Sequence, residues 1–216
     1  MAKVKACIFD LDGVIVDTAK YHYLAWRRLA HELGFEFTEK DNEQLKGVSR
    51  MRSLEILLSV GNIKIDDEKK KEELAEKKNN WYVEYISKMT EEEILPGVRE
   101  FLNLLKDNGI KIAIGSASKN TLTILERIGL KDFFDVVIDG TKISKAKPDP
   151  EVFLKAAQEL NIPPEECCVF EDAIAGIEAA KRAGMKVIGV GDPNILKEAD
   201  KVIQTFEGQN LELIDF

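Results

Sequence analysis

Cysteine is scarce in this 216-residue chain, which contains three: Cys7 within an apolar run, and the adjacent Cys167 and Cys168. Three cysteines do not make an even disulfide framework, and no two of them have the C-x-x-C spacing of a metal or redox motif. We therefore interpret them as reduced, buried thiols. Such cysteine use is typical of a cytoplasmic protein.

Long apolar stretches are absent as well, and no run of residues approaches the ~20 that a bilayer-spanning helix requires. The first residues lead directly into a strand-like segment without a signal-peptide pattern. The sequence also lacks an internal repeat or a low-complexity linker. We accordingly expect a cytoplasmic protein without a membrane partner.

Positive charge is in deficit, because 39 acidic residues outnumber 31 lysines and arginines and leave a net charge of −8 at pH 7. A nucleic acid or an anionic membrane rewards net positive charge, so neither is expected as a partner. A small anionic substrate is compatible with this balance if its pocket is locally positive. The hydrophobic share of 44% is that of an ordinary globular chain, so the protein can bury a core.

Short apolar runs rich in β-branched residues recur through the chain and alternate with helical patterns. They cover residues 4–9, 110–114, 136–138, 168–170 and 187–190. Alternation of this kind predicts a parallel sheet, and the nearly continuous apolar character of the runs predicts helices on both of its faces. The predicted fold class is therefore α/β, with a doubly wound, Rossmann-like parallel sheet.

About a hundred residues separate the first predicted strand from the second, far more than one helical connection needs. Apolar residues recur at helical spacing over three segments of this stretch, residues 17–34, 49–60 and 66–89. Pro96 and Gly97 mark the return to the alternating pattern. We predict a helical domain inserted at residues 16–93 and an α/β core domain made of residues 1–15 and 94–216.

The first predicted strand ends in the sequence Phe-Asp-Leu-Asp-Gly, which places Asp10 and Asp12 two residues apart. Open α/β sheets bind their ligands at this edge. An aspartate carboxylate is a competent nucleophile toward phosphorus, and a second carboxylate beside it can move protons on the attacking or leaving oxygen. A strand followed by an ordinary Asp-Gly turn is the alternative interpretation.

Three further segments follow predicted strands and present groups that suit a phosphate or a metal ion. Ser116 precedes a predicted helix, whose N-terminus favours a bound anion. Lys147 precedes a proline-stiffened turn and would offset negative charge beside a phosphorylated aspartate. Glu171 and Asp172 form an acidic pair, and clustered carboxylates suit Mg²⁺. Taken singly, each segment has a structural alternative: a helix cap, a solvated lysine or a capping aspartate.

This ordered set of residues resembles the four sequence motifs of the haloacid dehalogenase superfamily. The resemblance implies that Asp10 is the nucleophile, that Asp12 is the acid and base, and that Ser116 and Lys147 hold the phosphoryl group. The residues that it implies for one Mg²⁺ are Asp10, Asp12 through its backbone carbonyl, Asp172 and, in or near the coordination shell, Glu171. The helical insertion matches the superfamily's small α-helical cap.

Within the superfamily, nearly the whole chain resembles the β-phosphoglucomutase family, most clearly at residues 44–50 and 116–120. This resemblance implies a second phosphate site far from the nucleophile, with Arg50 as its main cationic contact. The residues implied for substrate binding are Thr18, His22, Trp26, Leu45, Lys46, Gly47, Val48, Ser49, Arg50, Ser53, Lys78, Ala117, Ser118, Lys119 and Asn120. Among these, His22 and Lys78 are expected to admit the substrate hydroxyl and to communicate with the acid–base aspartate.

The resemblance also implies an activity: an isomerase of carbohydrate metabolism that interconverts β-D-glucose 1-phosphate and β-D-glucose 6-phosphate through phosphorylated Asp10. β-Glucose 1,6-bisphosphate would be its intermediate and primer, and sugar phosphates would be the partners of a monomeric enzyme. A small-molecule phosphatase is the alternative, in which water attacks the aspartyl-phosphate. A receiver-like signalling domain, the non-enzymatic alternative, is disfavoured by the long helical insertion and the paired aspartates.

Overall fold

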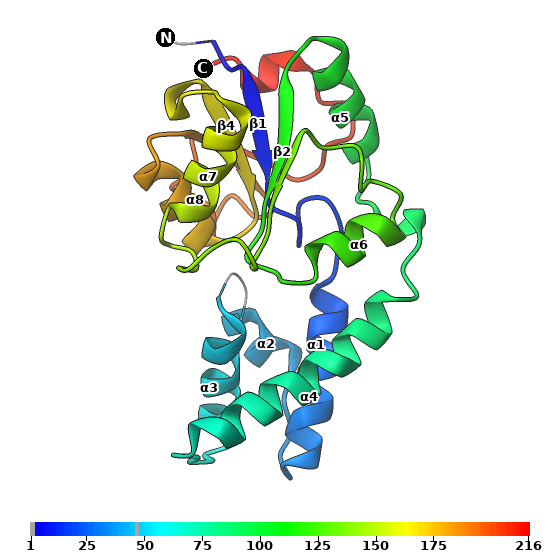
Figure 1. The fold of residues 1–216 in the computed structure, drawn as a ribbon, viewed down its shortest axis with the longest axis vertical. Helices are drawn as coiled ribbons and strands as arrows, with labels where there is room; N and C mark the ends of the chain where they lie inside the picture. The colour runs from blue at the N-terminus through cyan, green and yellow to red at the C-terminus, as the bar shows by residue number, and fades with distance from the viewer. Residues whose placement is uncertain (1–2, 46–47) are drawn as a thin grey trace.

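A computed structural model describes residues 3–45 and 48–216 and contains a parallel sheet covered by helices (Figure 1). The strands are β1 (Ala6–Phe9), β2 (Lys111–Gly115), β3 (Val136–Ile138), β4 (Cys167–Glu171), β5 (Lys186–Val190) and β6 (Lys201–Ile203). Their order across the sheet is β3-β2-β1-β4-β5-β6, and every neighbouring pair is parallel. The predicted doubly wound parallel sheet is therefore confirmed.

The helices of the sheet part lie on its two faces, α5 and α6 on one and α7 and α8 on the other (Figure 1). Their bounds are α5 (Val98–Asp107), α6 (Thr121–Arg127), α7 (Glu151–Leu160) and α8 (Ile174–Arg182). Side chains of a strand alternate between the faces, so Cys7 and Phe9 of β1 pack under α5 while Ala6 and Ile8 pack under α7. Both faces are buried, which explains the continuous apolar runs.

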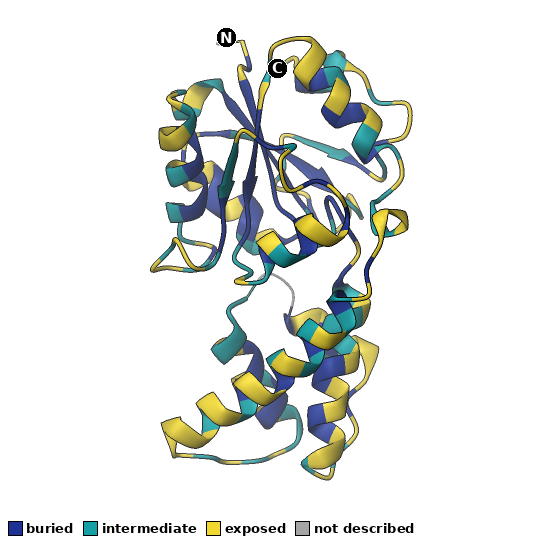
Figure 2. Ribbon diagram, turned by 45° about the vertical axis from the view of Figure 1, so that its right-hand side comes forward, coloured by how far each residue is buried: buried dark blue, intermediate teal, exposed yellow. Residues whose placement is uncertain are grey.

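Between β1 and β2 the chain forms a helical part, which lies beyond the carboxyl ends of the strands (Figure 1). Its helices are α1 (Ala19–Glu32), α2 (Glu39–Asn42), α3 (Arg50–Val60) and α4 (Glu68–Ile86). Trp26, Leu54 and Leu57 belong to a buried cluster of this part that is separate from the two clusters on the sheet faces. Figure 2 shows buried positions on the inner sides of these helices and exposed positions on their outer sides. The helical part thus has an apolar core of its own.

Capping side chains begin two helices of the helical part, α4 and α3. The Asp67 side chain accepts hydrogen bonds from the backbone N–H groups of Lys69 and Lys70, and the Ser49 side chain accepts one from Arg52. These side chains satisfy N–H groups that the first turn of a helix leaves without a partner.

Among the described residues, no helix combines the length and the apolar character that crossing a membrane requires.

The structure adds short elements that the sequence patterns do not predict. Strand β6 has three residues at the edge of the sheet, and α2 is a single turn opened by a reciprocal cap between Thr38 and Asp41. Short 3-10 helices cover Glu43–Leu45, Glu91–Glu93, Pro164–Glu166 and Leu211–Ile214. A segment this short rarely contains enough residues for hydrophobic periodicity to reveal it, although an apolar run did predict the three residues of β3.

Aromatic packing under α5 supports the strands that carry the site. The rings of Phe9 and Phe170 stack with centroids 4.7 Å apart, and those of Phe101 and Phe206 lie within 5.6 Å of the Phe170 ring. Phe9 and Phe170 come from neighbouring strands, so this stack fixes β1 against β4 directly behind the acidic residues.

We expect Phe170→Ala to lower the free energy of unfolding by about 3–5 kcal/mol, because it removes a buried ring and leaves a cavity. Leu154→Ala, at a residue that is 39% exposed on α7, is the matched control and should cost about 1 kcal/mol or less. Denaturant unfolding measures both values. An equal, small loss in the two variants would show that the aromatic cluster does not hold the strands together.

Candidate active site

Lys147 is the centre of a buried ion-pair network at the carboxyl edge of the sheet. Its Nζ donates hydrogen bonds to Asp10 Oδ1 at 2.7 Å and to Glu171 Oε2 at 3.0 Å, and all three side chains are buried. Burial alone would lower the pKa of Lys147, but the two carboxylates raise it above its ordinary value. Lys147 is therefore a fixed positive charge against the predicted nucleophile.

Asp10, Glu171 and Asp172 bring carboxylate oxygens within 4.8 Å of one another. Burial, followed by the charge of Asp10, raises the pKa of Glu171 well above its ordinary value. Carboxylates clustered this closely repel one another unless a cation lies among them, and Mg²⁺ prefers carboxylate oxygens as ligands. These residues therefore fit the predicted metal ion. The side chain of Asp12 is not part of this group, and its predicted contact is a backbone carbonyl.

Two glycines allow the acidic side chains to approach the backbone this closely. Gly13 has φ +79°, and a Cβ atom there would lie 2.2 Å from Asp172 Oδ2. A Cβ atom on Gly176, in the first turn of α8, would lie 2.0 Å from the Glu171 carboxyl carbon. The sequence Asp-Gly after β1 thus makes room for an acidic residue that follows β4.

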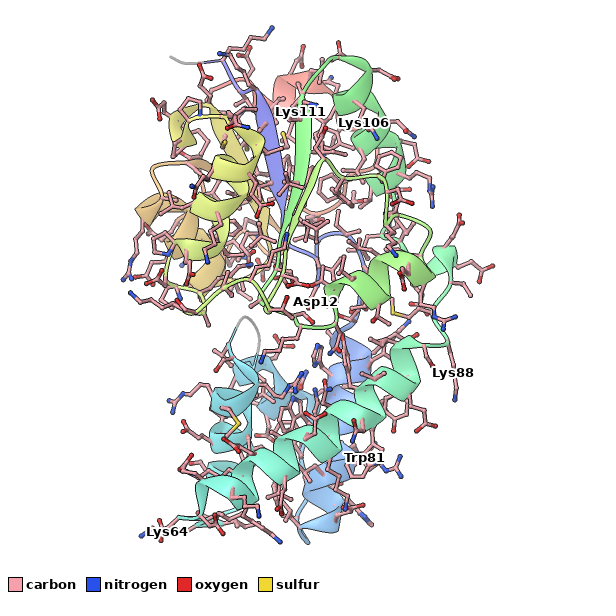
Figure 3. All side chains as sticks on the ribbon, viewed as in Figure 1. Asp12, Lys64, Trp81, Lys88, Lys106 and Lys111 are labelled. Carbon is pink, nitrogen blue, oxygen red and sulfur yellow. The ribbon has the colours of Figure 1, made fainter. Side chains whose placement is uncertain are left out.

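Asp12 lies at the end of the sheet that faces the helical part (Figure 3). Burial, and next the charge of Asp10, raise the pKa of Asp12 to about 6, although the Thr18 hydroxyl and two lysines act in the opposite direction. Thr18 Oγ1 donates a hydrogen bond to Asp12 Oδ1. Thr18 itself is fully buried and lies outside the pocket lining, so it contacts Asp12 where the resemblance implies a substrate contact.

A pocket of ≈ 730 Å³ separates this edge of the sheet from the helical part. The sheet part contributes Asp10, Asp12, Ser116, Ala117, Ser118, Lys119, Asn120, Lys147, Glu171 and Asp172 to its lining. The helical part contributes His22, Trp26, Leu45, Val48, Ser49, Arg50, Ser53 and Lys78. The structure thus brings together the predicted site residues around one cavity of a size that suits a small molecule. Thr18 is the exception, and Lys46 and Gly47 lie outside the described residues.

The segment after β2 is held in place by a hydrogen bond to β3 and by hydrogen bonds within the segment. The Ser116 N–H donates to Ile138 of β3 at 3.0 Å, and Ser116 Oγ accepts from the Ser118 N–H at 3.1 Å. Ser118 Oγ in turn accepts from the Asn120 N–H at 3.2 Å. These bonds curl the backbone so that residues 116–120 all face the pocket.

Lys78 places a buried amine in the pocket wall opposite the sheet. Its Nζ lies 2.9 Å from His22 Nδ1 and above the rings of Trp26 and Tyr82, at 4.5 and 4.8 Å from their centroids. Burial, and then the charge of Arg50, lower the pKa of Lys78 to about 7, while Asp12 opposes this shift. Burial together with Lys78 and Arg50 lowers the pKa of His22 well below its ordinary value, so His22 is neutral.

Further polar residues of the helical part line the pocket. Those that the sequence reasoning did not single out include Asn42, Glu72, Glu76 and Asn79. Glu76 Oε2 accepts from Arg50 Nη1 at 3.2 Å, and Asn79 Oδ1 accepts from Asn120 Nδ2 at 3.0 Å. Polar residues at helical spacing are usually solvated, so their pattern alone did not separate them from an exposed helix face.

The strand order and the buried acidic centre match the class of protein that the sequence motifs predict, the haloacid dehalogenase superfamily. A family model described as haloacid dehalogenase-like hydrolase matches residues 4–184. The β-phosphoglucomutase of Bacillus subtilis (strain 168) is 44% identical over 98% of this chain and 94% of that protein. The chain therefore belongs to the haloacid dehalogenase-like hydrolases.

Two more similarities extend over nearly the whole chain. The crystal structure of a β-phosphoglucomutase from Clostridium difficile matches with a TM-score of 0.93 and 46% identity, covering 98% of this chain and 96% of that one. The phosphorylated carbohydrates phosphatase of Thermotoga maritima is 36% identical over 92% of this chain and 93% of that protein. Both kinds of chemistry considered from the sequence are thus represented among its relatives.

The buried amine of Lys78 leads to a pH-dependent prediction about stability. Its pKa is about 7 when folded and 10.5 ordinarily, so the unfolded chain binds the extra proton between these values. The buried amine therefore lowers the free energy of unfolding. This loss grows as the pH falls from about 10.5 to about 7 and is constant below about pH 7. This shift includes the effects of both charged neighbours: Arg50 lowers the pKa of Lys78 and Asp12 raises it.

Lys78→Met should raise the free energy of unfolding, and the gain over wild type should be larger at about pH 7 than at about pH 9.5. Lys70→Met, at an exposed position of the same helix, is the control and should change little at either pH. Denaturant titrations at the two pH values give the comparison. A gain that is the same at both would mean that the amine keeps its ordinary pKa in the folded protein.

Proposed function

We propose that this protein is a phosphomutase that interconverts β-D-glucose 1-phosphate and β-D-glucose 6-phosphate through an aspartyl-phosphate on Asp10. One observation carries the proposal: a single pocket is lined by the Asp10–Lys147 centre and also by Arg50 and residues 118–120. We propose that Arg50, from the helical part, and residues 118–120, from the sheet part, form a second phosphate site. Two separate phosphate sites suit an enzyme that binds a sugar bisphosphate at both ends.

In this proposal Asp10 attacks phosphorus, its carboxylate oxygen forms the new P–O bond, and the bond to the leaving oxygen breaks. Lys147, which donates to Asp10 at 2.7 Å, offsets the negative charge on the nucleophile and the transferring group. Ser116, buried beside the nucleophile, donates to the same phosphoryl group. Lys147 and Ser116 keep their charge state during transfer, whereas the Asp10 carboxylate gives up its negative charge when it forms the acyl phosphate.

Asp12 protonates the leaving oxygen in one half-reaction and accepts the proton of the attacking hydroxyl in the other. A pKa of about 6 keeps both of its protonation states accessible near neutral pH, unlike that of a free aspartate. Thr18 holds this carboxylate through a hydrogen bond, and the charge of Lys78, which contacts His22, acts on it from the helical part. The reoriented bisphosphate intermediate then returns its other phosphate to Asp10.

We propose Asp10, Glu171 and Asp172, with the backbone carbonyl of Asp12, as the residues that hold Mg²⁺. When bound, Mg²⁺ would supply positive charge between the clustered carboxylates and the phosphoryl oxygens. The carboxylate separations within 4.8 Å and the raised pKa of Glu171 support this assignment.

We propose that residues 16–93 act as a cap domain over the α/β core of residues 1–15 and 94–216. The separate apolar cluster of the helical part supports this division. A cap that closes over the pocket would exclude water and strengthen the electrostatic interactions with the transferring group. Transfer to a sugar hydroxyl would then exceed transfer to water, which is the difference between a mutase and a phosphatase on this fold.

The decisive assay follows product formation from β-glucose 1-phosphate. A mutase should show a lag that trace glucose 1,6-bisphosphate shortens, because the bisphosphate primes Asp10, and it should release little inorganic phosphate. Asp10→Asn is the control and should form no product under either condition, since an amide is a poor nucleophile. If inorganic phosphate appears in proportion to the substrate consumed and glucose 6-phosphate does not, the protein is a phosphatase and this proposal fails.

A further inference from the structure

One face of α4 lines the pocket with residues spaced three or four apart, Glu72, Ala75, Glu76 and Asn79. Residues at this spacing lie on the same side of a helix. Through Glu76 and Asn79, this face contacts two residues of the proposed second phosphate site, Arg50 and Asn120. Arg50 belongs to α3 and Asn120 to the loop before α6, so α4 is the element that joins them.

The hydrogen bond between Asn79 and Asn120 joins the helical part to the sheet part, and both residues line the pocket. Both residues are half-buried, and the donor Nδ2 of Asn120 lies 3.0 Å from Oδ1 of Asn79. The backbone of Asn120 is held independently, because its N–H donates to Ser118 Oγ and its carbonyl accepts from the Ile124 N–H. What Asn79 determines is therefore the direction of the Asn120 side-chain amide.

A side-chain amide nitrogen carries two N–H donors. When one of those on Asn120 donates to Asn79, the second remains for an anion in the pocket. A free amide could rotate and present its oxygen to a phosphate, which would repel it. The Asn79 acceptor thus selects the orientation in which Asn120 donates.

We propose that Asn79 is a positioning residue for the sugar phosphate group held far from Asp10, acting through Asn120. This inference rests on the proposed function, because that function requires the second phosphate site. In this role the side chain of Asn79 must accept the hydrogen bond and must also be uncharged. An aspartate at this position would accept the same hydrogen bond but add a negative charge beside the phosphate, where the Glu76 carboxylate is already paired with Arg50.

The test compares Asn79→Ala with Asn80→Ala, a matched control because Asn80 is exposed on the same helix and does not line the pocket. We expect Asn79→Ala to raise KM for β-glucose 1-phosphate about threefold to tenfold, the effect of losing one hydrogen bond. The kcat should change little. The rate at which acetyl phosphate phosphorylates Asp10 should also be unchanged, because acetyl phosphate has no second phosphate; a general loss of structure would lower it.

Asn79→Asp separates the two parts of the proposal. It should raise KM at least as much as Asn79→Ala at low ionic strength, and added salt should reduce that loss because it screens the new charge. The loss in Asn79→Ala should not respond to salt. Equal KM values in Asn79→Ala and Asn80→Ala would overturn the proposal, as would a fall in the Asp10 phosphorylation rate that matches the change in kcat/KM.

The same reactions show whether any failure belongs to the proposed function instead. If the wild-type protein forms no glucose 6-phosphate, the phosphomutase proposal is wrong, and calorimetry with glucose 1,6-bisphosphate then decides the role of Asn79. In an Asp10→Asn background, binding that Asn79→Ala weakens about threefold to tenfold would support the positioning role. Unchanged binding would overturn it.

Discussion

The ion pair of Lys147 with Asp10 and Glu171 is the interaction on which the rest of the site depends. A buried ammonium group is costly unless carboxylates surround it, and the adjacent strands β1 and β4 supply one each. Removing the lysine would leave carboxylates buried and uncompensated, so the network holds these strand ends in one arrangement. The crowding of acidic side chains also explains the glycines at these positions, because a Cβ atom on Gly13 or Gly176 would have no space.

The opposite wall of the pocket carries a buried amine in a different setting. Among the described residues, no hydrogen bond or ion pair joins Lys78 to a carboxylate, and it contacts the rings of Trp26 and Tyr82 and the neutral His22. Arg50 lies near enough to lower the pKa of Lys78. Glu72 and Glu76 line this wall too, and Glu76 is paired with Arg50, so a second phosphate would compete with that carboxylate for the guanidinium. Each wall comes from a different part of the chain, so the complete site depends on how the helical part meets the sheet.

Much of the fold and of the acidic centre could be predicted from the sequence, because parallel strands end at one edge and bring Asp10 and Glu171 together whatever the connections between them. Which side of α4 faces the pocket was harder to predict from the sequence. The spacing of Leu74, Lys78, Trp81 and Tyr85 predicts its apolar side, whereas the buried residues of this helix are Ala75, Lys78, Tyr82 and Ile86. The helix packs against both the helical core and the sheet part, so no single stripe describes it. Asn79 faces the pocket because of that packing, which local periodicity does not contain.

The central claim is that Asp10 becomes phosphorylated, and the most direct measurement is the position of the label after the protein reacts with radioactive acetyl phosphate and Mg²⁺. Mass spectrometry of the digested protein should place one phosphoryl group on Asp10. The label should be absent from Asp10→Asn and present in Asp12→Asn, whose nucleophile is intact. A label on Ser116 or on another side chain, or one that persists in Asp10→Asn, would contradict the account.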